Sequence, residues 1–406
     1  MTTEKMGNSH EAPRQFETPR QKLIFLLFAC SAGAAVANVY FIQPITVVVA
    51  HEFSVASRTI AYVSAITQVG YSFGILLLSP LGDTLERKKL ILFKLTALAI
   101  VLGIIALSSS FWVFCAGCVL LGLLSSVGQD FVPAAAQLAP EGKRGVVVGL
   151  VTTGLLTGIL LSRTFSGAVS DLYGWRTVYV LALSSVLLVM GAVLTFMPRL
   201  NPISERRQGY LASLREMVTI WSRYPALRFA AFGQGAIAVS LGAFWSTLAI
   251  VLATPPYGLT AGTAGAFGLA GAAGAFLAPV FGRVGDKFGR DAAISVGSGL
   301  VILSFVAMLK FQGNIAVLVI GAIAFDAGVM ASLVSNQALV TGLLPEARSR
   351  MNGILMTCAM LGVAGGSTLA AFLWPRLGWT GTCILGLLAG FGSFACLQIR
   401  RRLISP

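Results

Sequence analysis

Long apolar stretches alternate with short polar segments along the whole chain. Twelve of these stretches are about twenty residues long or more, and they cover 23–50, 58–81, 89–108, 111–138, 145–170, 176–197, 226–253, 260–282, 291–311, 314–340, 350–374 and 377–399. An α-helix needs about 20 mostly apolar residues to cross the hydrocarbon of a bilayer. Strands of a membrane β-barrel would instead alternate over about 10 residues. The pattern therefore predicts an all-α membrane protein with twelve transmembrane helices.

The longest polar interruption divides the chain into two parts of six stretches each. We predict an N-terminal tail (1–22), a first six-helix bundle (23–197), a central loop (198–225), a second six-helix bundle (226–399) and a C-terminal tail (400–406). Within the central loop, 211–221 is amphipathic. It is either a short helix on the membrane surface or a linker that carries positive charge.

The two parts repeat each other at a nearly constant offset. Gly-Asp ending at Asp83 recurs at Asp286, 203 residues later, and Gly-Trp ending at Trp175 recurs at Trp379, 204 residues later. A colinear series of such pairs indicates a tandem duplication, the parallel repeat found in some secondary transporters.

Composition excludes a soluble enzyme and a disulfide scaffold. Charged residues make up 11% of the chain and hydrophobic residues 56%, whereas soluble domains are about a quarter charged. The net charge of +14 is sorted between loops: of 29 Lys and Arg residues, 23 lie in one alternating set of loops and 4 in the other. Positive residues favour cytoplasmic loops, so both termini are expected in the cytoplasm and nucleic-acid binding is not expected.

Two loop sequences resemble the signature of the major facilitator superfamily, Gly-x-x-x-Asp-Arg/Lys-x-Gly-Arg-Arg/Lys. The copy at 282–290 (GRVGDKFGR) is nearly complete, and the copy at 79–88 (SPLGDTLERK) departs from it at three positions. The segments 38–44 (NVYFIQP) and 161–167 (LSRTFSG) are similar to a bacterial subgroup of arabinose-efflux and drug-efflux permeases. The resemblance implies two pseudo-symmetric six-helix bundles, a monomer, and a place in the bacterial inner membrane.

The same resemblance implies a gating role for the two loop signatures. Asp83 with Arg87, and Asp286 with Arg290, would lock one conformational state through ion pairs. The alternative is that these charges only anchor the loops on the cytoplasmic side. The antiporter pattern of the fifth helix is also incomplete here, because no proline follows Gly158 where the family has one.

Ionisable side chains inside the apolar stretches are the first candidates for a transport site. Each costs about 2.5–3.5 kcal/mol to insert and therefore needs a functional reason. Asp130 and Asp326 lie near mid-bilayer and are the candidate proton-coupling residues, with a structural hydrogen-bonding role as the alternative. Arg163 would either bind an anionic group of the substrate or pair with an internal acid. Lys94, five residues from its loop, is expected to extend outward.

Neutral polar and aromatic positions complete the candidate site. The resemblance implies that helices 1, 4, 7 and 10 surround a central cavity. Tyr40-Phe41 and Phe244-Trp245 occupy equivalent positions of the two repeats and could form facing aromatic walls, although aromatics in spans also serve packing. The candidate substrate-binding residues are Asn38, Tyr40, Gln43, Gln129, Arg163, Phe244, Trp245, Asn336 and Gln337.

These features predict a secondary active transporter that exports a small organic molecule or drug by proton-coupled alternating access. No phosphate-binding loop is present in the sequence, so a proton gradient is the expected energy source, and neither a cofactor nor a metal is expected. The expected partners are a small-molecule substrate and the lipid bilayer. The alternatives are an importer or uniporter of a sugar or organic acid, and a non-transporting receptor or scaffold. Catalytic clusters of His, Asp or Cys are lacking, so no enzyme is expected.

Overall fold

The computed structural model describes residues 19–78, 80–83, 85–140, 143–200, 210–275, 277, 287–344 and 347–404. Within these ranges the regular structure is helical and there is no strand. The all-α class predicted from the apolar stretches is therefore confirmed.

The first half of the chain forms helices that follow the first six predicted spans, with local breaks. They are α1 (Pro19–Ala37), η1 (Asn38–Tyr40), α2 (Ile42–Glu52), α3 (Ser57–Phe73), η2 (Gly74–Leu78), η3 (Pro80–Asp83), α4 (Arg87–Leu107), α5 (Phe111–Ser125), α6 (Val127–Leu138), α7 (Arg144–Tyr173) and α8 (Trp175–Phe196). The breaks fall in the first, second and fourth spans, where short η turns or a helix junction interrupt the predicted helix.

The second half contributes α9 (Tyr210–Arg223), α10 (Pro225–Ala253), α11 (Ala261–Ala275), α13 (Arg290–Lys310), α14 (Ile315–Leu343) and α15 (Arg348–Ile404). Helix α15 covers the last two predicted spans and bends at Gly378. The φ of this residue is 50°, which glycine adopts readily because it has no Cβ. In the described ranges, ten helical segments are long and apolar enough to cross a membrane, α15 counting once. The remaining predicted span, 260–282, is described only as far as α11 and residue 277.

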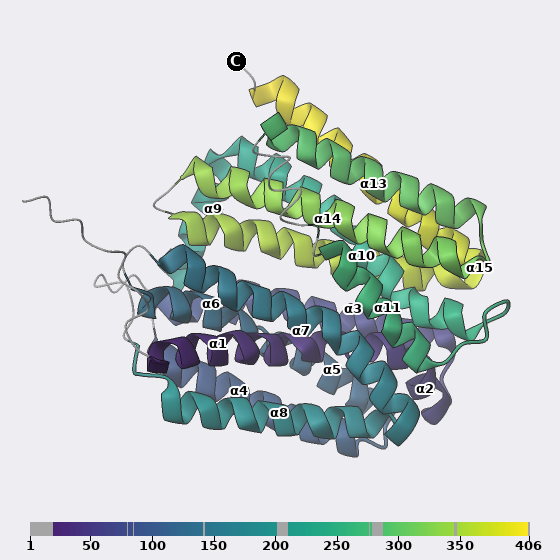
Figure 1. The fold of residues 1–406 in the computed structure, drawn as a ribbon, viewed down its shortest axis with the longest axis horizontal. Coiled ribbons are helices and arrows are strands. Elements are labelled where there is room, and N and C mark those ends of the chain that lie inside the picture. Colours follow the sequence, from purple (N-terminus) through teal and green to yellow (C-terminus); the bar gives the residue numbers. More distant parts are fainter. Residues whose placement is uncertain are drawn as a thin grey trace, which may run out of the picture.

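The helices of the two halves lie in two groups whose axes run roughly along one direction (Figure 1). Helices α1 and α4 to α8 lie on one side, and α10 and α13 to α15 on the other, with α3 and α11 between them. The start of α1 and the end of α15 lie at the same end of the molecule (Figure 1). We call this the terminal end and the opposite one the loop end.

Helix α9 covers the amphipathic part of the central loop, for which a helix and a linker were both open, and it packs on the second half. Met217, Ile220 and Trp221 belong to an apolar cluster with residues of α14 and α15. The Arg350 Nη1 atom also lies 2.5 Å from Glu216 Oε1. The helix is therefore attached to the second bundle through both an apolar face and an ion pair.

Glycine contacts hold equivalent helix pairs close together in both halves. A Cβ atom at Gly158 of α7 would lie 2.3 Å from the Gly33 carbonyl oxygen of α1. At the equivalent place in the second half, a Cβ atom at Gly362 of α15 would lie 2.1 Å from the Gly235 carbonyl oxygen of α10. Real side chains do not approach so closely, so these backbone contacts require glycine.

Candidate functional site

A cavity of about 120 Å³ lies between the two halves and contains most of the predicted charged site. Its walls are mainly aliphatic side chains and three methionines (Met330, Met356 and Met360). The polar and aromatic lining residues are Tyr40, Gln43, Tyr71, Gln129, Arg163, Gln234, Trp245 and Asp326. Six of these eight are among the candidate proton-coupling and substrate-binding residues listed from the sequence.

Arg163 of α7 is held between aromatic rings from both halves. Its guanidinium carbon lies 4.0 Å from the ring centroid of Trp245 on α10 and 5.0 Å from that of Tyr40 on η1. Its Nε atom donates a 2.7 Å hydrogen bond to Gln43 Oε1. Cation–π contacts of this kind are worth about 2 kcal/mol or more when they are desolvated. Among the described residues, Arg163 forms no direct ion pair.

Asp326 of α14 faces the same cavity from the second half. It is buried, and its Oδ2 atom has no hydrogen-bond partner among the described residues. Its charge interacts with that of Arg163, and the Trp245 side chain lies within hydrogen-bonding reach of the carboxylate. Trp245 therefore contacts a basic side chain from one half and an acidic side chain from the other.

Gly271 of α11 makes room for this arrangement. A Cβ atom at position 271 would lie 2.6 Å from Asp326 Oδ2 and 2.8 Å from Trp245 Cζ2. Any larger residue would push the carboxylate or the indole out of place.

The loop end of the cavity is closed by α7 and α11. A Cβ atom at Gly265 would lie 2.5 Å from the Arg163 carbonyl oxygen. Thr164 Oγ1 donates a 3.0 Å hydrogen bond to the Gly265 carbonyl, and Asp171 Oδ2 accepts a 2.7 Å hydrogen bond from the Gly262 N–H. The two halves are therefore in direct backbone contact from Arg163 outward.

A second cavity of about 190 Å³ adjoins the first toward the terminal end. Gln129 and Met356 line both cavities, and Asp130 lines only the second. The Asp130 Oδ2 atom lies 2.6 Å from Lys94 Nζ, and each side chain is 1% exposed. The expectation that Lys94 extends outward is therefore wrong: the lysine turns inward because the buried carboxylate of α6 lies within its reach.

Several candidate residues lie outside the central cavity. The Asn38 amide donates to the Ala34 and Ala35 carbonyls of the preceding helix, α1. Phe244 packs against Phe305, Phe325 and Trp379 in the core of the second half. Gln337 lies with its Nε2 atom 3.5 Å from the Met356 sulfur.

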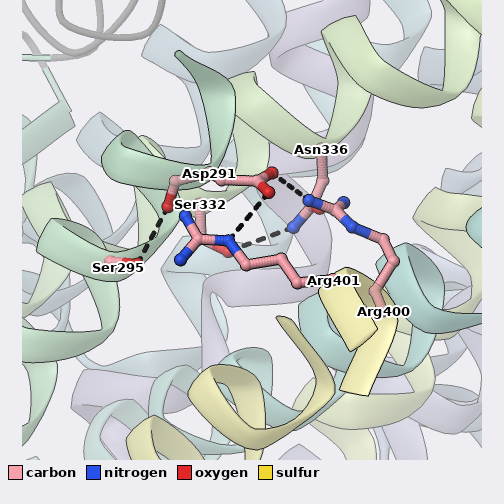
Figure 2. A network of polar contacts seen from close by, with 6 residues as sticks. All are labelled: Asp291, Ser295, Ser332, Asn336, Arg400 and Arg401. Carbon is pink, nitrogen blue, oxygen red and sulfur yellow. Dashed lines mark hydrogen bonds and ion pairs between the residues drawn. The ribbon is translucent and has the colours of Figure 1, made fainter. Parts of the chain in front are cut away.

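Asn336 belongs to a hydrogen-bonded group behind the cavity wall. It donates to Ser332 Oγ and to Gln234 Oε1, at 3.2 and 3.3 Å. Figure 2 shows it close to a charged cluster in which Asp291 pairs with Arg400 and Arg401. This cluster joins the start of α13 to the end of α15.

The predicted gating pairs are described only in part. Asp286 and the side chain of Asp83 lie outside the described residues. Arg87 is buried and lines the second cavity, whereas Arg290 is exposed at the start of α13. The ion pairs expected from the two loop signatures therefore stay a prediction.

Tyr71 and the three methionines are cavity residues that the site prediction did not include. Tyr71 OH accepts a 2.9 Å hydrogen bond from Gln129 Nε2. The sequence does not show that Tyr71 contacts the predicted site residue Gln129, because the two residues lie on different helices. Methionines in an apolar stretch cannot be told from ordinary packing residues. Among the described residues, no group of His, Cys, Asp and Glu could hold a metal ion.

The chain belongs to the Major Facilitator Superfamily, whose sequence model matches residues 24–309 and 230–403. It is 35% identical over 363 residues to the uncharacterized transporter YgaY of Escherichia coli O157:H7, which covers 89% of this chain and 92% of that protein. The multidrug resistance protein MdtG of Enterobacter lignolyticus is 26% identical over 239 residues, or 57% of this chain and 56% of that one. The solved peptide transporter POT has the same fold, with a TM-score of 0.74 at 13% identity over 96% of both chains. The protein is thus a multi-pass membrane transporter of this superfamily.

Proposed function

We propose that the protein exports a small, largely apolar organic molecule in exchange for protons, by alternating access across the bacterial inner membrane with both termini in the cytoplasm. The observation that carries the proposal is the buried Asp326 carboxylate on the cavity wall, with one oxygen that lacks a hydrogen-bond partner among the described residues. A proton carrier has to lie on the transport pathway and exist in both charge states. Asp326 meets the first condition, and the nearby Arg163 charge compensates its ionised form.

Asp130 has a secondary part in this proposal. Its direct ion pair with Lys94 already satisfies its charge. We therefore assign proton coupling first to Asp326, and we place Asp130 at the cytoplasmic approach to the cavity, where it lines the second cavity with Gln129.

The cavity lining supports an apolar substrate of variable shape. Met330, Met356 and Met360 present flexible, polarizable side chains, which adapt to different ligands. The similarity to MdtG, a multidrug resistance protein, favours the same substrate class. The protein as described is closed at the loop end, and its second cavity lies toward the end that carries the termini, as a cytoplasm-facing state requires.

The test uses purified protein in proteoliposomes with and without an imposed pH gradient. Ethidium and radiolabelled chloramphenicol serve as probes of the drug class. We expect the pH gradient to drive transport of at least one probe by the wild type. In D326N the gradient should no longer drive transport, but exchange of the probe at equal pH should be retained. E52Q is the matched control, because Glu52 is an exposed carboxylate paired with Arg176 away from the cavity. Flux that ignores the gradient in the wild type would refute proton coupling and favour a uniporter.

A further inference from the structure

The residues around Arg163 separate the central cavity from the loop end. Gln43, Arg163 and Trp245 line the cavity, and the same three residues line a small void of about 10 Å³ beyond it. Residues that face two separate spaces form the partition between them. Arg163 is therefore placed where the transport pathway is closed.

This partition is built from both halves of the molecule. Arg163 comes from α7, and Gln43 from α2, in the first half; Trp245 comes from α10 in the second. The 4.0 Å contact between the guanidinium and the indole is thus a contact across the interface at which the halves must separate. The backbone contact between Arg163 and Gly265 continues the closure toward the loop end.

We propose that Arg163, clamped by Gln43 and stacked on Trp245, is a latch that holds the loop end closed, and that the charge of Asp326 controls its strength. We call these three residues the Arg163 latch. The inference rests on the proposed function in one respect only, that the halves alternate between two states. It gives Arg163 a positioning role at the gate in place of a direct role in substrate binding.

The charge dependence follows from the positions of the three side chains. Ionised Asp326 attracts the guanidinium toward the second half, and Trp245 contacts both side chains. The other titratable side chains on the cavity wall are Tyr40, whose ring flanks the guanidinium from the first half, and Tyr71. Neutralising Asp326 by protonation or by substrate removes this attraction. The free energy of the closed state then rises relative to that of the open state.

The inference is tested by a distance measurement that needs neither substrate nor gradient. Spin labels are placed on cysteines at Leu172, which is 73% exposed at the end of α7, and at Thr260, which precedes α11. The six native cysteines are replaced first. The distance between the labels, measured by pulsed electron paramagnetic resonance in nanodiscs, reports whether the loop end is closed.

We expect R163A and W245A to shift the ratio of closed to open populations by roughly 10- to 30-fold, the value of a desolvated cation–π contact. D326N should give a smaller shift in the same direction. W245F keeps an aromatic ring, so its ratio of closed to open populations should stay close to that of the wild type. R163K keeps the charge but loses the planar guanidinium, so its ratio should lie between those of the wild type and R163A. A wild-type distance in W245F would attribute the shift in W245A to the lost ring contact.

The matched control is R176A. Arg176 also stacks on a tryptophan, with its guanidinium carbon 4.4 Å from the Trp175 ring, but both residues belong to the first half. R176A should leave the distance unchanged. Unshifted distances in R163A and W245A, or an equal shift in R176A, would overturn the latch, and an unshifted D326N would overturn its control by charge. Failure of proton coupling would appear only in the flux assay, so the two proposals fail separately.

Discussion

Removing the amine of Lys94 should destabilise the protein strongly, because it removes the cation that lies against the buried Asp130 carboxylate. The two side chains are each 1% exposed and their charged atoms are 2.6 Å apart. Breaking one partner of a buried ion pair costs about 3–5 kcal/mol. We therefore expect K94M, which keeps the length of the side chain, to lower the free energy of unfolding by about 3 kcal/mol, or roughly 150-fold in the equilibrium constant.

The assay is denaturant unfolding in detergent micelles, followed by tryptophan fluorescence. Adding D130N to K94M should recover most of the loss, because a neutral amide no longer needs a cation. K89M is the matched control: Lys89 pairs with Glu86 on the surface, where its side chain is 79% exposed, so no measurable change is expected. A K94M protein within about 1 kcal/mol of the wild type, or a double variant whose losses simply add, would refute this reasoning.

Two further predictions concern the cavity and the end of α15. Gly271→Ala should abolish probe transport in proteoliposomes without unfolding the protein, since its Cβ would lie 2.6 Å from Asp326 Oδ2. The same change at Gly299, where a Cβ meets nothing within 4 Å, should leave transport intact. D291N should lower the free energy of unfolding by about 2 kcal/mol in the micelle assay, because it weakens a charge-assisted contact to Arg400, whose side chain is 7% exposed; a loss below about 0.5 kcal/mol would contradict this.

The helices could be predicted from the sequence because bilayer thickness sets the length of an apolar stretch. The depth of a charged residue follows from the same count, and the structure places both Asp326 and Arg163 on the cavity wall. The interruption at η2 has no comparable signal, because apolar residues continue through it. The interruption at η1 does have one: Pro44 lacks the N–H that would bond to the carbonyl of Tyr40 in a continuous helix.

Depth does not determine which way a side chain faces. Asn336 lies on α14 ten residues after Asp326, and successive helical residues turn by about 100°. The two side chains are therefore about 80° apart around the helix, and Asn336 faces the hydrogen-bonded group with Gln234 instead of the cavity. The prediction that Lys94 extends outward was wrong because its partner, Asp130, lies 36 residues away in sequence, and the depth of Lys94 does not show that the two residues meet.

The glycine contact between Gly158 and Gly33, and its counterpart between Gly362 and Gly235, bear on the history of the chain. The same tight seam occurs at the same helix pair in both repeats. The simplest history is that a single ancestral unit already possessed this seam before its gene was copied and fused. In such a unit this helix pair would already have been tightly packed before the fusion. The fusion then left the surface between the two copies as the part that had to change for transport.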